Sequence, residues 1–219
     1  MSETIVRVLP GEAIEPQLRA GVTLLLAAGV HRAPVVIECN VTLRGEAGAV
    51  LEADRAGSVL AVEADGLTVR VEGLTLRGGA GEAGGGLRLA GWSEVTLVNV
   101  VLEDNEATQS SGGVGGGAFV LRGSLTAEDC TFQRNRAGVG SDLAVWGAAR
   151  ASVRGGFFAG DVSCRDGAEL SIVGAHVTGQ LELRGTSTRA PQVVLKGARI
   201  DGGVHNDVNQ PATLSVEDG

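Results

Sequence analysis

Short runs of alternating apolar and polar residues recur along the chain, and turns that contain glycine separate them. In each run the residue two positions after the first is again small or apolar, which is typical of a β-strand with one face turned inward. The spacing between runs varies, as expected when insertions are confined to the turns of a solenoid. Seven aligned copies of this strand begin at Leu67, Val95, Leu125, Ala151, Leu170, Val193 and Leu214.

Each repeat contains two more apolar runs, one after a tight turn and one after a glycine-rich turn. The second run supplies the apolar residues Leu74, Leu102, Phe132, Phe158, Val177 and Ile200. These strands are too short, and the turns between them too brief, for the helical crossovers of a doubly wound α/β fold. The pattern therefore predicts an all-β protein, a right-handed parallel β-helix of about seven coils with three short strands each.

A single solenoid can use the whole chain of 219 residues, so residues 1–219 are expected to form one domain. We divide it into an N-terminal cap region, residues 1–21, and the coils, residues 22–216. Within the first part, Pro10–Ala20 is expected to form a short cap over the first coil. No capping segment is visible after the strand that begins at Leu214, so that strand is expected to leave an edge that a partner could cover.

The composition narrows the classes of function. With 35 glycines, 43% hydrophobic and 3% aromatic residues, the chain suits thin, tightly turned strands rather than disorder. A net charge of -8 argues against a nucleic-acid partner, because that affinity comes from clustered lysine and arginine. The first residues lack a signal-peptide pattern and no run approaches a membrane span, so we expect a cytoplasmic protein without a membrane partner. Cys39, Cys130 and Cys164 lack metal-binding spacing and are expected to be reduced thiols.

Two sets of motifs resemble known β-helices. The segments 41–45, 66–70 and 73–78, which read VTLRG, GLTVR and GLTLRG, resemble strands of the pectin-lyase-like superfamily. The segments 115–118 and 132–135, which read GGGA and FQRN, are similar to the short repeats of polymorphic outer-membrane proteins. The resemblance covers nearly the whole chain and implies the same right-handed β-helix.

The superfamily that the chain resembles includes polysaccharide lyases, glycoside hydrolases, epimerases, tailspikes and surface repeats, so the fold does not decide the function. Its polygalacturonase-like hydrolases lead us to expect a paired Asp-Asp and a Gly-His-Gly sequence. The chain has no adjacent Asp-Asp, and none of His31, His176 and His205 has glycine on both sides. The Trp-Ile-Asp-His pattern of pectate lyases is missing as well. No catalytic residue is therefore carried over, and we expect neither a cofactor nor a metal.

The turns between the second and third strands are longest in three consecutive coils, at 78–86, 105–117 and 135–142. Because consecutive coils stack, these turns are expected to form one overhanging ridge, where a solenoid often places its binding surface. The alignment stacks polar residues near its base, with Asp104 beside Arg134 and with Arg77 beside the asparagines of the next two coils. The candidate ligand-binding residues are Glu103, Asp104, Arg134 and Arg77.

Each candidate group also has a structural interpretation. Glu103 and Asp104 could bind Ca²⁺ or orient a sugar, and Arg134 could pair with a carboxylate substrate, but a solvated ladder of opposite charges is favoured. Asn105 and Asn135 fall at equivalent turn positions, which favours a structural asparagine ladder.

The two tryptophans, Trp92 and Trp146, each follow a third strand. Both could stack on sugar rings if they were exposed together, but covering the turns is the favoured role because the chain carries few aromatic residues.

Taken together, these patterns favour a non-enzymatic structural or protein-interaction module. Its partner would be a second copy, bound end to end through the C-terminal coil, or another protein. The alternative is a carbohydrate-binding or polysaccharide-processing β-helix that uses the ridge of coils 2–4. Such a protein would act on carbohydrate through the charged and aromatic residues named above.

Overall fold

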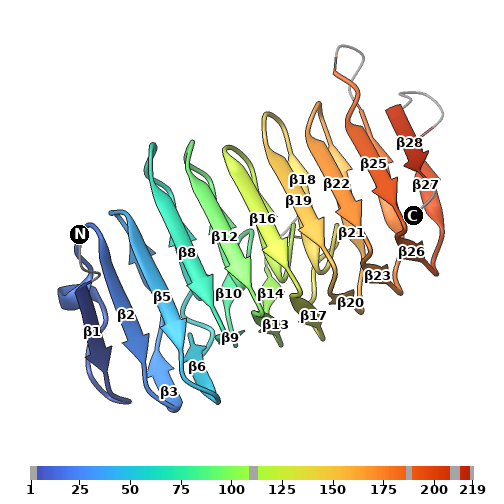
Figure 1. Ribbon diagram of the computed structural model, residues 1–219. Coiled ribbons are helices and arrows are strands. Elements are labelled where there is room, and N and C mark those ends of the chain that lie inside the picture. The colour runs from blue at the N-terminus through green and yellow to red at the C-terminus, as the bar shows by residue number, and fades with distance from the viewer. Residues whose placement is uncertain (1–3, 109–112, 186–188, 208–212, 218–219) are drawn as a thin grey trace.

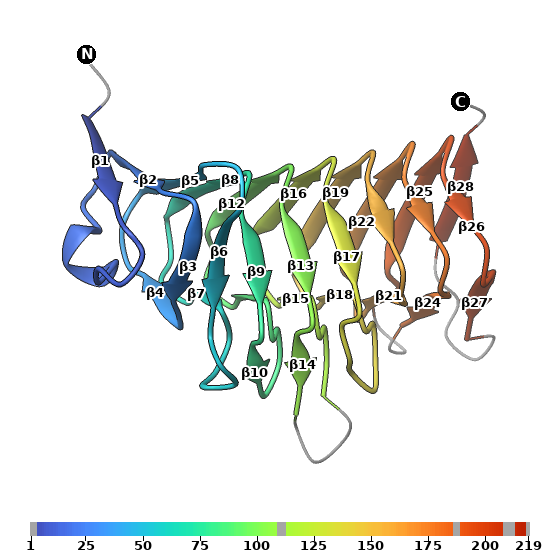
Figure 2. The same ribbon diagram turned by 90° about the horizontal axis from the view of Figure 1, so that it is seen from below.

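The computed structural model describes residues 4–108, 113–185, 189–207 and 213–217, and they form a right-handed parallel β-helix (Figure 1). Three long parallel sheets run along the rod, and each coil contributes one strand to each sheet (Figure 2). Sheet A has ten strands, sheets B and C have eight strands each, and a further pair of short strands lies outside them. Among the described residues, eight successive coils have a strand in all three sheets, compared with the approximately seven expected from the sequence.

The strands of sheet A are β1 (Thr4–Val8), β2 (Val22–Leu26), β5 (Val41–Gly45), β8 (Thr68–Glu72), β12 (Glu94–Val98), β16 (Ser124–Glu128), β19 (Arg150–Arg154), β22 (Glu169–Val173), β25 (Gln192–Lys196) and β28 (Thr213–Glu217). Sheet B consists of β3 (Gly29–Arg32), β6 (Ala49–Glu52), β9 (Thr75–Arg77), β13 (Val101–Glu103), β17 (Thr131–Gln133), β20 (Phe157–Phe158), β23 (His176–Val177) and β26 (Arg199–Ile200). Sheet C consists of β4 (Val35–Ile37), β7 (Leu60–Val62), β11 (Leu87–Leu89), β15 (Ala118–Val120), β18 (Leu143–Trp146), β21 (Val162–Arg165), β24 (Leu181–Arg184) and β27 (Val204–Asn206).

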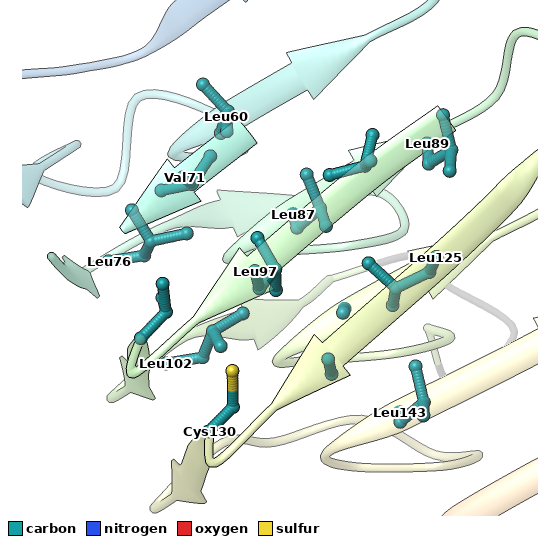
Figure 3. Packing of buried hydrophobic residues seen from close by; sticks show 14 of the residues in the cluster. Leu60, Val71, Leu76, Leu87, Leu89, Leu97, Leu102, Leu125, Cys130 and Leu143 are labelled. Carbon is teal, nitrogen blue, oxygen red and sulfur yellow. The ribbon is translucent and has the colours of Figure 1, made fainter. Parts of the chain in front are cut away.

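As the alternation in the sequence predicts, every second side chain of a strand points into the interior. These side chains form continuous apolar columns, because each strand pairs in register with the same strand of the next coil. Figure 3 shows Leu76, Leu97 and Leu102 directed into this interior. Cys130 belongs to the same core, and burial raises the pKa of its thiol to about 11, as expected for a packing residue rather than a nucleophile.

The structure corrects the first position of the sequence alignment. The sequence aligned Leu67 with Val95, but β8 pairs Val69 with Val95, two residues further along. A shift by two residues preserves the alternation of inward and outward positions, so the pattern alone could not exclude it. One consequence is that Arg77 pairs with Glu103 in sheet B and does not stack with the asparagines. The later copies, from Val95 to Leu214, have the predicted register.

The N-terminal region contains a strand as well as a cap. β1 pairs in parallel with β2 and so extends sheet A by one strand that the sequence did not indicate. The cap that follows includes a short 3₁₀ helix, η1 (Glu15–Gln17), at the N-terminal end of the rod (Figure 2). Ile14 is buried in the core, and Pro10 packs so closely on Gly29 that a Cβ atom there would lie 2.8 Å from its Cγ atom.

The three long turns between sheets B and C stack on one another as a ridge. β10 (Ala80–Gly81) pairs with β14 (Glu106–Ala107), and Val114 forms parallel bridges with Ala83 and Val139 of the turns on either side. Ala83 and Val114 also pack on Phe119, which lies on the outer face of sheet C. The ridge is therefore held against the rod by a small apolar cluster of its own. No helix in the described part of the chain is long and apolar enough to cross a membrane.

Candidate functional site

The corner at the end of sheet B brings together the charged residues expected to form a site. β9, β13 and β17 end side by side at Arg77, Glu103 and Gln133. The residues that follow two of these strands, Asp104 and Arg134, have φ angles of 54° and 55°. This left-handed conformation, in which aspartate is tolerated better than most residues, turns the chain out of sheet B toward the ridge.

Arg134 binds both acidic residues of the preceding coil. Its Nη2 atom donates to Glu103 Oε2 over 2.6 Å, and its Nε and Nη2 atoms each donate to one carboxylate oxygen of Asp104 over 2.9 Å. Gln133 adds a fourth hydrogen bond, from Nε2 to Glu103 Oε2 over 2.8 Å. The hydrogen bonds from Arg134 lower the pKa of Asp104 and those carboxylates raise the pKa of Arg134. The three charged groups therefore satisfy one another.

Arg77, the fourth candidate, is directed to a different partner. Its Nε atom donates to Glu52 Oε1 on the preceding coil over 2.9 Å. Pairing in sheet B places Arg32, Glu52, Arg77 and Glu103 in one column along the rod. This column alternates in sign, which is the arrangement that stabilises neighbouring strands through opposite charges.

A shallow hollow of about 200 Å³ lies beside this column and is lined by Arg55, Asp104, Asn105, Glu106, Arg134 and Arg136. Two ion pairs occupy its wall, because Arg55 also binds Glu106 over 2.7 Å. A cation would have to displace Arg134 before it could reach Glu103 and Asp104. Among the described residues, no three His, Cys, Asp or Glu side chains come close enough to hold a metal ion.

Asn105 and Asn135 form a buried hydrogen-bonded chain between coils. Asn105 Nδ2 donates to the Leu76 carbonyl oxygen over 3.0 Å and to Asn135 Oδ1 over 3.1 Å. Asn135 Nδ2 donates in turn to the Leu102 carbonyl oxygen and to Asp142 Oδ1, each over 2.9 Å. The side-chain amides thus satisfy backbone groups at a corner where the strands end.

Asp142 ends this chain and was not identified from the sequence as a member of it. Its side chain is completely buried, and its Oδ2 atom accepts a hydrogen bond from the Gly160 amide over 2.6 Å. Burial raises the pKa of this carboxyl group, although the hydrogen bonds from Asn135 and Gly160 oppose that effect. The only available signal was its position seven residues after Asn135, at the end of the third long turn.

The two tryptophans occupy different environments. Trp92 lies in the turn between β11 and β12 with 52% of its surface exposed, and it borders a surface hollow of about 620 Å³ that Arg150, Arg189 and Gln192 also line. Trp146, which ends β18, is partly buried. It packs edge-on against Phe119, with 5.7 Å between ring centroids, and under the guanidinium of Arg165. Trp146 does not line the hollow beside Trp92.

The C-terminal end of the rod exposes side chains of the inward columns. Leu214 and Val216 of β28 pair with Val193 and Leu195 of β25, both of which are buried. Leu214 is nevertheless 37% exposed and Val216 is 70% exposed. In sheet C, Val204 is 40% exposed although its partner Leu181 is buried.

These three exposed residues form the surface that we call the end face, defined by Val204, Leu214 and Val216. The opposite end of the rod differs, because the cap residue Ile14 is inserted there into the core. Comparisons with protein-family models, curated proteins and solved structures each gave no match.

Proposed function

We propose that this protein is a non-enzymatic structural or protein-interaction module and that the end face is its contact surface. The observation that carries the proposal is the exposure of Leu214 and Val216 at positions that are buried in the adjacent coil. Covering exposed apolar side chains is favourable because it removes their surface from water. Unpaired strand edges in turn favour the addition of another strand. The same end therefore offers both apolar surface and backbone hydrogen-bonding groups.

The proposal includes the resemblance to the pectin-lyase-like superfamily, which the parallel three-sheet architecture supports. It also places the protein in the cytoplasm. The three cysteines are free thiols, and Cys130 and Cys164 lie in the core, which suits a reducing compartment.

The charged corner supports a structural role over a catalytic one. Glu103 and Asp104 are both bound by Arg134, and Arg77 is bound by Glu52. A catalytic pair of carboxyl groups needs environments that separate their pKa values so that one group can act as acid and the other as base. Here a single guanidinium binds both carboxylates, and its hydrogen bonds lower the pKa of Asp104.

Carbohydrate binding is the second candidate function, and exposed Trp92 is the observation that favours it. Its ring borders a hollow that also presents Arg150, Arg189 and Gln192, which are groups able to bind sugar hydroxyl or carboxylate groups. No second aromatic residue lines this hollow among the described residues. The binding would therefore depend on one stacking contact, and replacing Trp92 would abolish it.

The proposed function is tested by incubating the protein with acidic polysaccharides, with and without Ca²⁺. We expect no unsaturated uronide absorbance, no new reducing ends and no shift in Tm. Turnover that disappears in Arg134→Ala, while the variant keeps its circular dichroism spectrum, would show that the charged corner is catalytic. A shift in Tm that disappears in Trp92→Ala would instead establish the carbohydrate-binding function.

A further inference from the structure

The backbone of β28 is bonded on one side to β25, and no strand among the described residues pairs with its other side, which we call the open edge. The Thr213 amide donates to the Pro191 carbonyl oxygen over 3.0 Å, and the Glu217 carbonyl oxygen accepts from the Gly197 amide over 3.4 Å. Backbone groups of a parallel strand alternate in direction from one residue to the next. The N–H and C=O groups of Leu214 and Val216 therefore point away from β25, along the open edge of sheet A.

We infer that the occupant of the end face is a second copy of this chain, related by a two-fold axis through Ser215, with the two β28 strands antiparallel. This inference rests on the proposed function, since it names the partner of the same surface. In this arrangement Leu214 faces Val216 of the second copy, and Val216 faces its Leu214. Each of these two pairs exchanges two backbone hydrogen bonds, which satisfies all the groups that point along the open edge.

Side chains in this register are complementary. Directly opposed residues of an antiparallel pair lie on the same face of the sheet, so Leu214 and Val216 of both copies meet on the inner face. The apolar column of sheet A then continues from one molecule into the other. On the outer face Glu217 lies opposite Thr213 of the second copy, so no like charges are opposed, and Glu217 keeps its contact with Lys196 at 3.8 Å.

The same rotation turns the edge of sheet B toward the edge of sheet C of the second copy. β26 and β27 form these edges in the described part of the chain. Ile200 is packed against the core and Val204 is 40% exposed, so each edge brings an apolar residue to the junction. The interface is isologous and closes after two copies.

The N-terminal end exposes less of the core than the C-terminal end, which favours the two-fold dimer over a head-to-tail filament. A stack that continued the register of sheet A would place Glu217 beside Arg7 and Ser215 beside Ile5 of the next copy. Arg7 is already bound to Glu46 of its own chain over 2.9 Å. The cap residue Ile14 is buried in the core at that end, and the inward side chains of β2, β3 and β4 are buried as well.

The position of the axis is tested with Ser215→Cys. Directly opposed residues of a pair without hydrogen bonds between them have Cα atoms about 4.5 Å apart, within the range that a disulfide bridges. We expect Ser215→Cys to give a covalent dimer under mild oxidation. Ser171→Cys is the matched control, because Ser171 lies in the same outward column but two strands inside the sheet. The wild type shows whether the native cysteines crosslink by themselves. We expect neither the wild type nor Ser171→Cys to form a covalent dimer.

Sedimentation of the uncrosslinked protein tests the partner itself. We expect the mass to rise with concentration from 22.2 kDa to twice that value and to stop there. Val216→Asp should raise the dissociation constant about 100-fold or more, because each junction would bury two unpaired carboxylates. Val216 is 70% exposed in one copy, so the variant should keep its Tm when dilute. Ile5→Asp, at the other end, should dimerise like the wild type.

Three outcomes would overturn this inference. They are a wild type that stays monomeric, larger oligomers that Ile5→Asp abolishes, and dimers in which Ser215→Cys is not crosslinked. None of these outcomes is evidence of polysaccharide turnover, so the proposal of a non-enzymatic module would still stand. Turnover, in contrast, would overturn the proposed function whatever the mass of the protein.

Discussion

At the scale of single residues, the interior of this β-helix tolerates polar groups where they complete a hydrogen-bonded chain between coils. Asn105 and Asn135 satisfy backbone carbonyl groups at the corner after sheet B, and Asp142 accepts from Asn135 and from the Gly160 amide. Leaving one of these groups without a partner would cost about 1–3 kcal/mol. This hydrogen-bonded chain is therefore structural. Asp142 is its one titratable member, so its contribution to stability depends on pH.

Replacing Asp142 by asparagine should change how stability depends on pH. Burial raises the pKa of Asp142 above the unfolded value of about 3.9, so between these two values the folded state holds a proton that the unfolded state has lost. The contribution of this group to stability is therefore greatest below the unfolded pKa and falls as pH rises through the folded pKa. Urea unfolding at several pH values should show the wild type losing stability relative to Asp142→Asn over that window.

The matched control for this prediction is Glu94→Gln, which changes an exposed carboxylate on the outer face of sheet A. A change in pH dependence that both variants share is not assigned to Asp142. A difference between the wild type and Asp142→Asn that stays constant with pH would show that Asp142 titrates normally in the folded protein.

At the scale of the strand, position along the rod decides how much a core residue stabilises the fold. Leu125 and Leu214 occupy the same inward column of sheet A, but Leu125 is buried between two coils and Leu214 is partly exposed on the last described strand. Removing a fully buried leucine side chain costs about 2–5 kcal/mol, because it adds a cavity to the lost transfer free energy. The cost is smaller where one side of the side chain already faces solvent.

We therefore expect Leu125→Ala to lower the free energy of unfolding by about 2–5 kcal/mol and Leu214→Ala by less than about 1 kcal/mol. The comparison should be made in the Val216→Asp background, where the end face stays open. Equal losses in urea unfolding would contradict the exposed position of Leu214.

The strand columns were predictable from the sequence because a period of two determines which residues face inward. The same argument could predict neither the register between β8 and β12 nor the strand β1. A shift of two residues leaves the alternation intact, so Leu67 and Val69 fitted the column equally well, and only pairing with Val95 distinguishes them. β1 lacked a preceding copy that would mark it as a repeat.

The candidate site shows a similar limit. The sequence brought Glu103, Asp104 and Arg134 to one corner, and the structure places them there within hydrogen-bonding distance. The choice of partners depended on side-chain direction and on the corrected register, which places Arg77 between Glu52 and Glu103. Likewise, only the path of the third long turn brings Asp142 to Asn135.

At the scale of the whole molecule, the two ends of the rod differ. The N-terminal end is covered by the cap, in which Ile14 is buried. In the described part of the chain, the C-terminal end presents the end face and an edge of β28 with which no strand pairs. A rod of this kind can satisfy the backbone groups of β28 that point away from β25 by pairing with a second copy through a two-fold axis. This asymmetry is what links the fold to the proposed association.

Hydrogen exchange of the Leu214 and Val216 amides reports whether a second copy pairs with β28, since both N–H groups point away from β25. In dilute solution these amides should exchange freely, whereas at concentrations that favour the dimer their exchange should slow markedly because the second copy accepts their hydrogen bonds. In Val216→Asp the Leu214 amide should exchange freely at every concentration. Fast exchange in the wild type that does not change with concentration would contradict the account.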